Sequence, residues 1–298
     1  MRQLYIYPVV VLLLGILSAA PLQAAKLKHR GTLYSDNTAQ ALKAPEGVAC
    51  DAESFVVADT GNSRLVRYRL SAQSLAPEAV YPVPGSNLLV TQLDNHGNIY
   101  VLDGKSRKIL ILDAKGQSKG KLEPKGVPGS KTIIPRSFRL FAGQIYLLDI
   151  FSNRLLELDS NDKFQRQLAF PEDAEFFSDL TIGPQGTIYL LDSVAGAIYR
   201  AAAGADSFSL FSSGLKEYLN FPTNLATDKN GELYLSDQYG SGLVAISRDG
   251  SFQGRKFGMG WEDGQLYYPS QLCINEQNNL VIADRSNNRV QVFKILED

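Results

Sequence analysis

The stretch NNLVIADRSNNRVQVFK, at residues 278–294, decides the fold of this chain. It contains an apolar run that ends at Asp284, a polar turn, and a second apolar run from Val290 to Phe293. Short runs rich in Val, Ile, Leu and Phe, separated by Asn, Asp or Gly, are typical of antiparallel strands. The stretch therefore predicts two antiparallel strands joined by a short polar loop.

The same pattern occurs six times along the chain. Each copy is an apolar run that ends in an aspartate: SFVVAD at Asp59, NIYVLD at Asp103, QIYLLD at Asp149, TIYLLD at Asp192, ELYLSD at Asp237 and NLVIAD at Asp284. Successive aspartates are separated by 44, 46, 43, 45 and 47 residues. A repeat of this length is the sequence signature of an architecture built from stacked supersecondary units.

Each repeat predicts a unit of four antiparallel strands, in which the aspartate ends the second strand. Such a unit cannot bury both of its faces alone, whereas a closed ring of units buries the faces and shelters the edges. The chain ends after a third strand, and residues 26–36, KLKHRGTLYSD, look like a fourth. We therefore expect an all-β, six-bladed β-propeller of four-stranded antiparallel blades over residues 25–298, closed by a strand near Lys28–Tyr34 that completes the last blade.

Three of the repeats carry a resemblance to a known family: ADTGNSRLVRY at residues 58–68, LDIFSNRLLEL at 148–158 and ADRSNNRVQVF at 283–293. With its proline-led first strands, the chain from Lys26 onward resembles the NHL-repeat family. The resemblance implies a six-bladed propeller and a binding function, because NHL propellers are mostly binding modules for proteins, peptides or RNA. Some relatives on related six-bladed scaffolds are enzymes, so the fold alone does not fix the function.

Residues 1–24 have the order of a secretory signal peptide. A positive charge at Arg2 precedes an apolar run from about Leu4 to Leu17, and small residues follow it. Cleavage fits after Ala24, with Ala25 as a second position, and an uncleaved membrane anchor is the alternative. We therefore expect an exported protein, periplasmic or extracellular, with no membrane span after processing.

The charge balance argues against a nucleic-acid partner. The chain has 30 Lys and Arg against 31 Asp and Glu, a formal net charge of −1. Nucleic-acid-binding domains concentrate basic residues on one face, whereas here they are spread along the chain without a block of like charge. We therefore expect no nucleic acid among the partners.

The six repeated aspartates are predicted to cap turns and not to bind metal or act as catalysts. One occurs in each blade, so they lie in six separate turns, where a carboxylate accepts backbone N–H groups. Four of them have a basic residue five positions later, in the pairs Asp59–Arg64, Asp103–Lys108, Asp149–Arg154 and Asp284–Arg289. Ala197 and Gly242 replace that base in blades four and five, so we expect Asp192 and Asp237 to be less fully paired.

The sequence assigns no catalytic residues. It contains two histidines, His29 and His96, which fall in different structural contexts. No Ser–His–Asp, Cys–His or HExxH arrangement can therefore be assembled from the chain.

The two cysteines, Cys50 and Cys273, fall on the first strands of blades one and six, which are neighbours in a closed ring. Strand alternation places them on opposite sheet faces, and in adjacent blades such faces either confront each other or point apart. Two buried free thiols are the default expectation. Export would permit a disulfide instead.

First strands of a propeller line its central tunnel, and their alternation places Arg139, Asp179, Asn224 and Gln271 near the axis. We expect Arg139 and Asp179 to pair in a hydrated tunnel, with no cofactor. The alternative is a Ca²⁺ site formed by Asp179, Asn224 and Gln271, because oxygen ligands suit Ca²⁺. Similarity to lactonase-like six-bladed propellers, which hold a catalytic metal with such groups, implies this alternative, although Arg139 would oppose a cation.

Aromatic residues outside the repeat pattern gather in the loops that enter first strands or join second to third strands. In a propeller these loops emerge on the same face, and loop aromatics and arginines are typical binding anchors. The residues that we expect to bind a ligand are Arg136, Arg139, Phe176, Phe177, Asp179, Tyr218, Tyr239, Trp261, Tyr267 and Tyr268. For Phe176 and Phe177 the alternative is packing beneath their own loops.

The sequence thus predicts an exported binding or scaffold propeller that recognises a protein, peptide or glycan on this loop-rich face. The alternative function is a metal-dependent, hydrolase- or lyase-like enzyme with Ca²⁺ in the tunnel. Metal analysis of the purified protein discriminates between the two.

Overall fold

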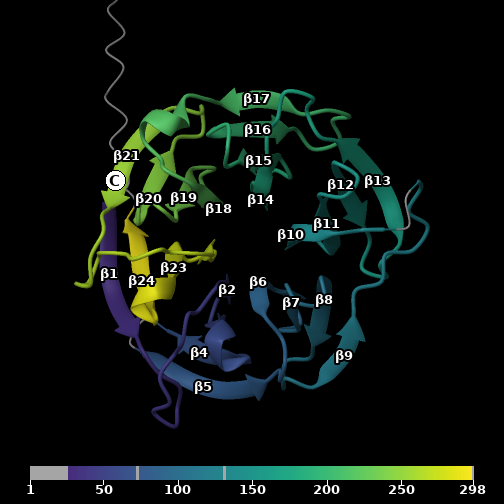
Figure 1. Ribbon diagram of the computed structural model, residues 1–298. Helices are drawn as coiled ribbons and strands as arrows, with labels where there is room; N and C mark the ends of the chain where they lie inside the picture. Colours follow the sequence, from purple (N-terminus) through teal and green to yellow (C-terminus); the bar gives the residue numbers. More distant parts are fainter. Residues whose placement is uncertain (1–25, 72–73, 130–131, 297–298) are drawn as a thin grey trace, which may run out of the picture.

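The computed structural model describes residues 26–71, 74–129 and 132–296, and the predicted signal peptide lies outside these ranges. Six four-stranded antiparallel sheets surround a central axis, with the first strand of each sheet nearest the axis and the fourth at the rim (Figure 1). The prediction of six four-stranded blades is thus confirmed.

The strands follow one another in chain order within blades 1 to 5. Blade 1 contains β2 (Gly47–Cys50), β3 (Ser54–Asp59), β4 (Arg64–Leu70) and β5 (Leu75–Pro82). Blade 2 contains β6 (Leu88–Leu93), β7 (Ile99–Asp103), β8 (Lys108–Leu112) and β9 (Ser118–Lys121). Blade 3 contains β10 (Pro135–Phe141), β11 (Gln144–Asp149), β12 (Arg154–Leu158) and β13 (Phe164–Ala169).

Blade 4 contains β14 (Phe177–Ile182), β15 (Ile188–Asp192), β16 (Ala197–Ala201) and β17 (Ser209–Ser212). Blade 5 contains β18 (Pro222–Thr227), β19 (Leu233–Asp237), β20 (Gly242–Ile246) and β21 (Phe252–Phe257). Short 3₁₀ turns in the loops are η1 (Thr60–Asn62), η2 (Leu215–Glu217) and η3 (Arg285–Asn287).

Blade 6 combines segments from both ends of the described chain. Its inner strands are β22 (Leu272–Ile274), β23 (Asn279–Asp284) and β24 (Arg289–Leu296), and β1 (Lys26–Leu33) is the outermost strand. β1 runs antiparallel to β24, from the pair Lys26–Leu296 to the pair Leu33–Val290. The predicted closure by an N-terminal strand is therefore confirmed, and β1 covers the outer edge of β24.

The apolar core fills the six seams between neighbouring blades. Six clusters of buried side chains each combine residues from two adjacent blades. At the closing seam, for example, Phe55 and Tyr68 of blade 1 pack with Val281 and Val290 of blade 6. The apolar set of each strand thus faces a neighbouring blade, which explains why a single blade would not be stable alone.

The repeated aspartates accept backbone N–H groups, as the sequence predicts, and in every blade one of these groups belongs to the loop that enters the first strand. All six are buried, and each accepts at least one backbone N–H group. Three of the predicted ion pairs are present, with N–O distances of 2.6, 3.0 and 2.7 Å for Asp59–Arg64, Asp149–Arg154 and Asp284–Arg289.

The predicted pair of Asp103 with Lys108 is wrong. Lys108 is exposed, and the carboxylate of Asp103 instead accepts the backbone N–H groups of Asn87, Lys105 and Ser106. Burial opposes the charge of Asp103, but a hydrogen bond from the Ser106 side chain and these backbone hydrogen bonds prevail and lower its pKa.

Blades 4 and 5 satisfy their aspartates in different ways. In the described structure Asp192 pairs with no base, and it accepts four backbone N–H groups from the residues Glu175, Phe176, Val194 and Ala195. Asp237 pairs with Arg255 of β21, so the expectation that Asp237 is less fully paired is wrong. Gly242 stands where four of the other blades carry the base, and a Cβ there would lie 2.0 Å from Nη1 of Arg255. The glycine therefore leaves the space that the guanidinium occupies.

Replacing Gly242 by alanine is expected to destabilise the fold by about 1–3 kcal/mol, because the methyl group must displace Arg255 or shift the backbone of Phe257. Urea unfolding measures the change. Gly258→Ala is the matched control, because a Cβ at Gly258 meets no atom within 4 Å, and the free energy of unfolding should change by less than about 1 kcal/mol. Equal losses in both variants would contradict the role assigned to Gly242.

Candidate functional site

The candidate site is built on bulges in the first strands. In blades 3, 4 and 5 the pairing of the first and second strands skips one residue, which is Arg136, Ser178 and Thr223 respectively. In blade 2 it skips Leu89 and Val90. An extra residue bends its strand and redirects a side chain, a device that is frequent next to functional sites.

All of these bulge residues line a cavity of about 400 Å³ at the mouth of the central tunnel, here called the mouth cavity. Blades 1 and 6 contribute Glu46 and Ser270, so all six blades reach it. Loop residues that include Tyr239, Tyr268 and Arg285 complete the wall. The cavity thus combines charged, hydroxyl and aromatic groups in one concave surface.

Asp179, which lines the mouth cavity, forms an ion pair with Arg139 of the neighbouring blade 3. Nη2 of Arg139 lies 2.6 Å from Oδ2 of Asp179, and the two side chains are 9% and 1% exposed. Asp179 also accepts hydrogen bonds from the side chains of Ser137 and Asn224 and from the backbone N–H of Leu225. Burial raises the pKa of Asp179, and the charge of Arg139 opposes that shift. The expected pairing of Arg139 with Asp179 is confirmed.

The residues of the alternative Ca²⁺ site have different partners. Asn224 donates its amide group to Asp179, whereas the amide oxygen of Gln271 accepts the backbone N–H groups of Val48 and Thr91. Within the described ranges, no three His, Cys, Asp or Glu side chains are grouped so as to hold a metal ion. Asn224 and Gln271 therefore tie the first strands of different blades together.

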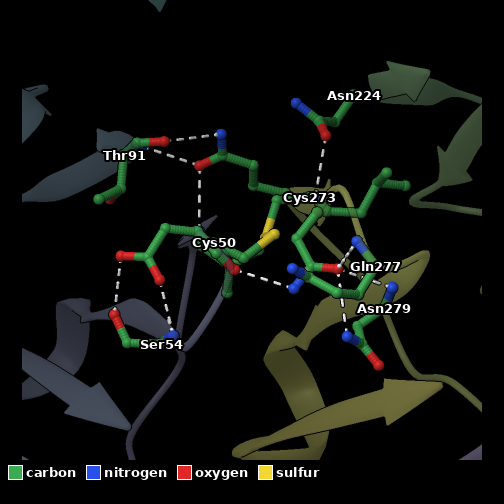
Figure 2. Close-up of a disulfide and its surroundings, with 12 residues drawn as sticks. Cys50, Ser54, Thr91, Asn224, Cys273, Gln277 and Asn279 are labelled. Atoms are coloured by element: carbon green, nitrogen blue, oxygen red, sulfur yellow. Dashed lines mark hydrogen bonds between the residues drawn. A yellow bond between two sulfur atoms is a disulfide. The ribbon is translucent and has the colours of Figure 1, made fainter. Parts of the chain in front are cut away.

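The two cysteines link the blades at the closing seam. Cys50 of β2 and Cys273 of β22 form a disulfide, with Cα atoms 6.0 Å apart and a sequence separation of 223. Figure 2 shows the bond between the ribbons of the two blades. The default expectation of two free thiols is wrong, because the opposite faces that carry the cysteines confront each other at this seam.

The charged groups of the mouth cavity are not all paired. Glu46 forms an ion pair with Arg285; burial raises the pKa of Glu46, and the charges of Arg285 and Arg136 oppose that rise. Arg136 itself has no ion-pair partner among the described residues. Its guanidinium lies over the ring of Phe176, with Cζ 5.5 Å from the ring centroid, and its buried Nε has no hydrogen-bond acceptor. The cavity therefore offers an arginine that forms no ion pair with a carboxylate in the described part of the chain.

A continuous row of aromatic rings, here called the aromatic strip, passes the mouth cavity and ends in the loop between β21 and β22. Its members are, in order, Phe221, Tyr239, Tyr268, Tyr267 and Trp261. Successive ring centroids are 5.1, 5.9, 5.1 and 6.1 Å apart. Tyr239 and Trp261 expose 55% and 72% of their surfaces. The strip thus presents two exposed rings that three neighbouring rings support.

Tyr268 has a strained backbone. Its φ angle is +48°, in the left-handed region that a bulky residue rarely adopts. Such strain persists where the surroundings hold it, and it is concentrated at functional sites. The N–H of Tyr268 donates to Oγ of Ser241 at 3.2 Å, so a loop of blade 5 helps to fix the conformation. Tyr268 thereby belongs both to the aromatic strip and to the wall of the mouth cavity.

The other predicted binding residues lie in different surroundings. Phe177 is 3% exposed and packs against Phe170 and Tyr199, so it belongs to the core between blades 3 and 4. Tyr218 is exposed and stacks on Phe252, outside the residues that line the mouth cavity. The predicted residues that the structure does bring together at the cavity are Arg136, Asp179, Tyr239 and Tyr268.

Sequence reasoning missed Glu46, Ser270 and Arg285 as site residues. Glu46 and Ser270 each stand one residue before the first tunnel-lining position of their blade. An alignment of the six repeats locates that position, and so it could have located these two residues. Arg285 directly follows a repeated aspartate and so opens a loop on the same face. All three residues could therefore have been found by examining the positions next to the repeated aspartates and next to the tunnel-lining residues.

Comparison with known sequences identifies one repeat family. The NHL repeat model matches residues 266–293, which include β22, β23 and most of β24. The E3 ubiquitin-protein ligase TRIM71 of Xenopus tropicalis is 39% identical over 66 residues, which amounts to 22% of this chain and 7% of that protein. The match therefore covers a small part of the length of this curated relative.

Solved structures share the whole ring. A streptogramin B lyase aligns with a TM-score of 0.67 at 12% identity, over 92% of this chain and 98% of that chain. A gluconolactonase from Xanthomonas campestris aligns with a TM-score of 0.68 at 17% identity, over 91% and 90%. A virginiamycin B lyase from Staphylococcus aureus aligns with a TM-score of 0.60 at 14% identity, over 91% and 100%. At sequence identities this low, the similarity to these three structures shows a shared fold alone.

Over the described residues, no helix has the length and apolar character needed to cross a membrane. The repeat match lies in the blade that closes the ring, and the same strand–aspartate–loop pattern recurs in the other five. The chain is therefore a six-bladed β-propeller that carries an NHL repeat in its closing blade.

Proposed function

We propose that the protein is an exported binding module that recognises a protein, peptide or glycan partner through the aromatic strip and the mouth cavity. The observation that carries the proposal is the strip: the repeat pattern does not require rings at these loop positions, yet they form one continuous row. Tyrosine, tryptophan and arginine are enriched among the residues that dominate binding energy at interfaces.

Exposed apolar side chains gather around the outer end of the strip. Met259 and Tyr34 expose 59% and 52% of their surfaces. Nη1 of Arg289 donates both to the carbonyl of Trp261 and to the hydroxyl of Tyr34, so these residues are held next to each other. Contiguous exposed apolar surface marks an interaction site more strongly than scattered residues do. We therefore expect partner contacts to extend from the mouth cavity to Tyr34.

Export is the second part of the proposal, and two features support it. The first residues of the chain have the order of a secretory signal peptide. The Cys50–Cys273 disulfide suits an oxidising compartment, which the periplasm or the extracellular space provides.

Combining Trp261→Ala with Tyr268→Gly is expected to weaken partner binding by about tenfold or more, because it removes the most exposed ring of the strip and one of its rings that also lines the mouth cavity. Glycine at position 268 tolerates the positive φ, so the substitution relieves strain as it removes the ring. Affinity capture from the native envelope fraction, followed by titration of the captured partner, measures the loss.

His96→Ala combined with Asn230→Ala is the matched control. Both residues lie in turns between first and second strands, at the opposite end of the blades. This double variant should bind the partner as the wild type does. If it loses binding while the strip variant keeps it, the site lies on the opposite face and the proposal fails.

A further inference from the structure

We propose that the mouth cavity binds the carboxyl-terminal carboxylate of a peptide, with Arg136 as its cationic partner, and that the residues before that terminus cross the aromatic strip. The inference rests on the proposed binding function and names the ligand class of the same site.

The side chain of Arg136 is positioned to bind an anion in the mouth cavity. The bulge in β10 redirects its side chain to the cavity, and Phe176 lies against one face of the guanidinium. Its Nε is buried without an acceptor, which costs free energy until a ligand supplies one. A guanidinium can donate two parallel hydrogen bonds to one carboxylate, a geometry that favours this group over other acceptors.

The charges around the mouth cavity match a single negative charge. Glu46 is paired with Arg285, and Asp179 is paired with Arg139. One positive charge, that of Arg136, is left over. A cation would meet this charge directly, whereas a phosphate dianion would leave surplus negative charge beside Glu46. One carboxylate therefore fits the charge balance best.

The geometry of the aromatic strip favours a peptide over a glycan. The rings of Phe221 and Tyr239 are stacked at 24°, but along the rest of the strip, from Tyr239 to Trp261, the planes of neighbouring rings meet at 66°, 81° and 50°. Successive sugars stack on ring faces that share an orientation, whereas tilted and edge-to-face rings enclose irregular apolar clefts that suit side chains. Capture of a carboxyl-terminal carboxylate is also a recurring mode of peptide recognition.

A hydroxyl in the cavity wall can hold the peptide backbone. Oγ1 of Thr223 is buried at the bulge of β18 and has no hydrogen-bond partner among the described residues. A peptide that places its terminus in the cavity brings backbone amide groups with it, and these satisfy such a hydroxyl.

Two pools of random decapeptides test the inference, one with free carboxyl termini and one amidated at that end. The wild-type protein should enrich the free-acid pool, and its best peptide should bind about tenfold or more tightly than the amidated form of the same peptide. Arg136→Gln should reduce this preference to near equality. Glu46→Gln should strengthen binding of the free acid, because it removes a repulsive charge and releases Arg285.

Arg248→Gln is the matched charge control, because it removes one positive charge from an exposed turn at the opposite end of blade 5. It should leave both the affinity and the preference unchanged, and all variants should keep a cooperative melting transition. If both peptide pools bind equally well, and the Trp261→Ala and Tyr268→Gly variant loses this binding, the carboxylate inference is overturned. The proposed binding function then stands. Binding of glycans and of neither peptide pool would also overturn it. An absence of binding to peptides, glycans and envelope proteins alike would remove the proposed function as well.

Discussion

Replacing Arg139 by alanine is expected to lower the free energy of unfolding by about 3–5 kcal/mol at neutral pH, because it leaves the buried carboxylate of Asp179 without its counter-charge. Ser137 and Asn224 continue to donate hydrogen bonds to Asp179, but neutral donors do not replace a full charge. Urea unfolding followed by circular dichroism measures the loss.

The size of this loss should depend on pH in a direction that the structure sets. Burial raises the pKa of Asp179, and Arg139 opposes the rise, so removing Arg139 raises the folded-state pKa further above its unfolded value. A folded state with the raised pKa binds a proton more readily than the unfolded chain does. The loss of stability in Arg139→Ala therefore becomes smaller as the pH falls through the raised pKa of Asp179. At pH values above that pKa the loss has its full size. The difference between wild type and Arg139→Ala should be smaller at about pH 5 than at about pH 8.

The double variant Arg139→Met with Asp179→Leu separates charge from packing. It removes both charges and keeps apolar side chains of similar volume, a replacement that is frequently neutral for buried ion pairs. It should be more stable than Arg139→Ala alone and should lose the extra pH dependence. If the double variant is no more stable than the single one, the side-chain volume or the hydrogen bonds that Asp179 accepts, and not the unpaired charge, determine the loss.

The ring could be predicted because its decisive contacts are local. In the pairs Asp59–Arg64, Asp149–Arg154 and Asp284–Arg289, both partners belong to one strand–loop–strand unit, so the spacing in the sequence reports the contact. The same logic failed for Asp237, because Arg255 reaches it from the fourth strand of the blade. A five-residue spacing contains no information on a partner that lies 18 residues away in sequence.

The candidate site was harder to predict because its residues come from all six blades. Glu46 and Ser270 have ordinary surroundings in the sequence, and they become site residues only when the ring brings six equivalent positions together. Phe176 and Phe177 are consecutive phenylalanines, which the sequence does not distinguish. Consecutive side chains at the start of a strand, however, point in different directions. One ring therefore lies beside Arg136 and the other lies in the core.

Reduction of the Cys50–Cys273 disulfide is expected to lower the free energy of unfolding by about 2–5 kcal/mol. The bond joins residues with a sequence separation of 223, so it restricts most of the unfolded chain, and long loops carry the largest entropic effect. In the folded ring it fastens the first strands of blades 1 and 6, whereas the β1–β24 ladder completes blade 6 at its outer edge. Urea unfolding with and without a reducing agent measures the contribution.

Cys50→Ala and Cys273→Ala should each cause nearly the whole loss, and the double variant should lose little more, because either substitution removes the same bond. A reducing agent should have no further effect on these variants. Protein produced in a reducing cytosol should unfold like the double variant until it is oxidised, and the proposed export would bring the chain to a compartment where the bond forms. Unchanged unfolding after full reduction of both sulfurs would mean that the β1–β24 ladder and the apolar cluster around Phe55 and Val281 hold the seam without the bond.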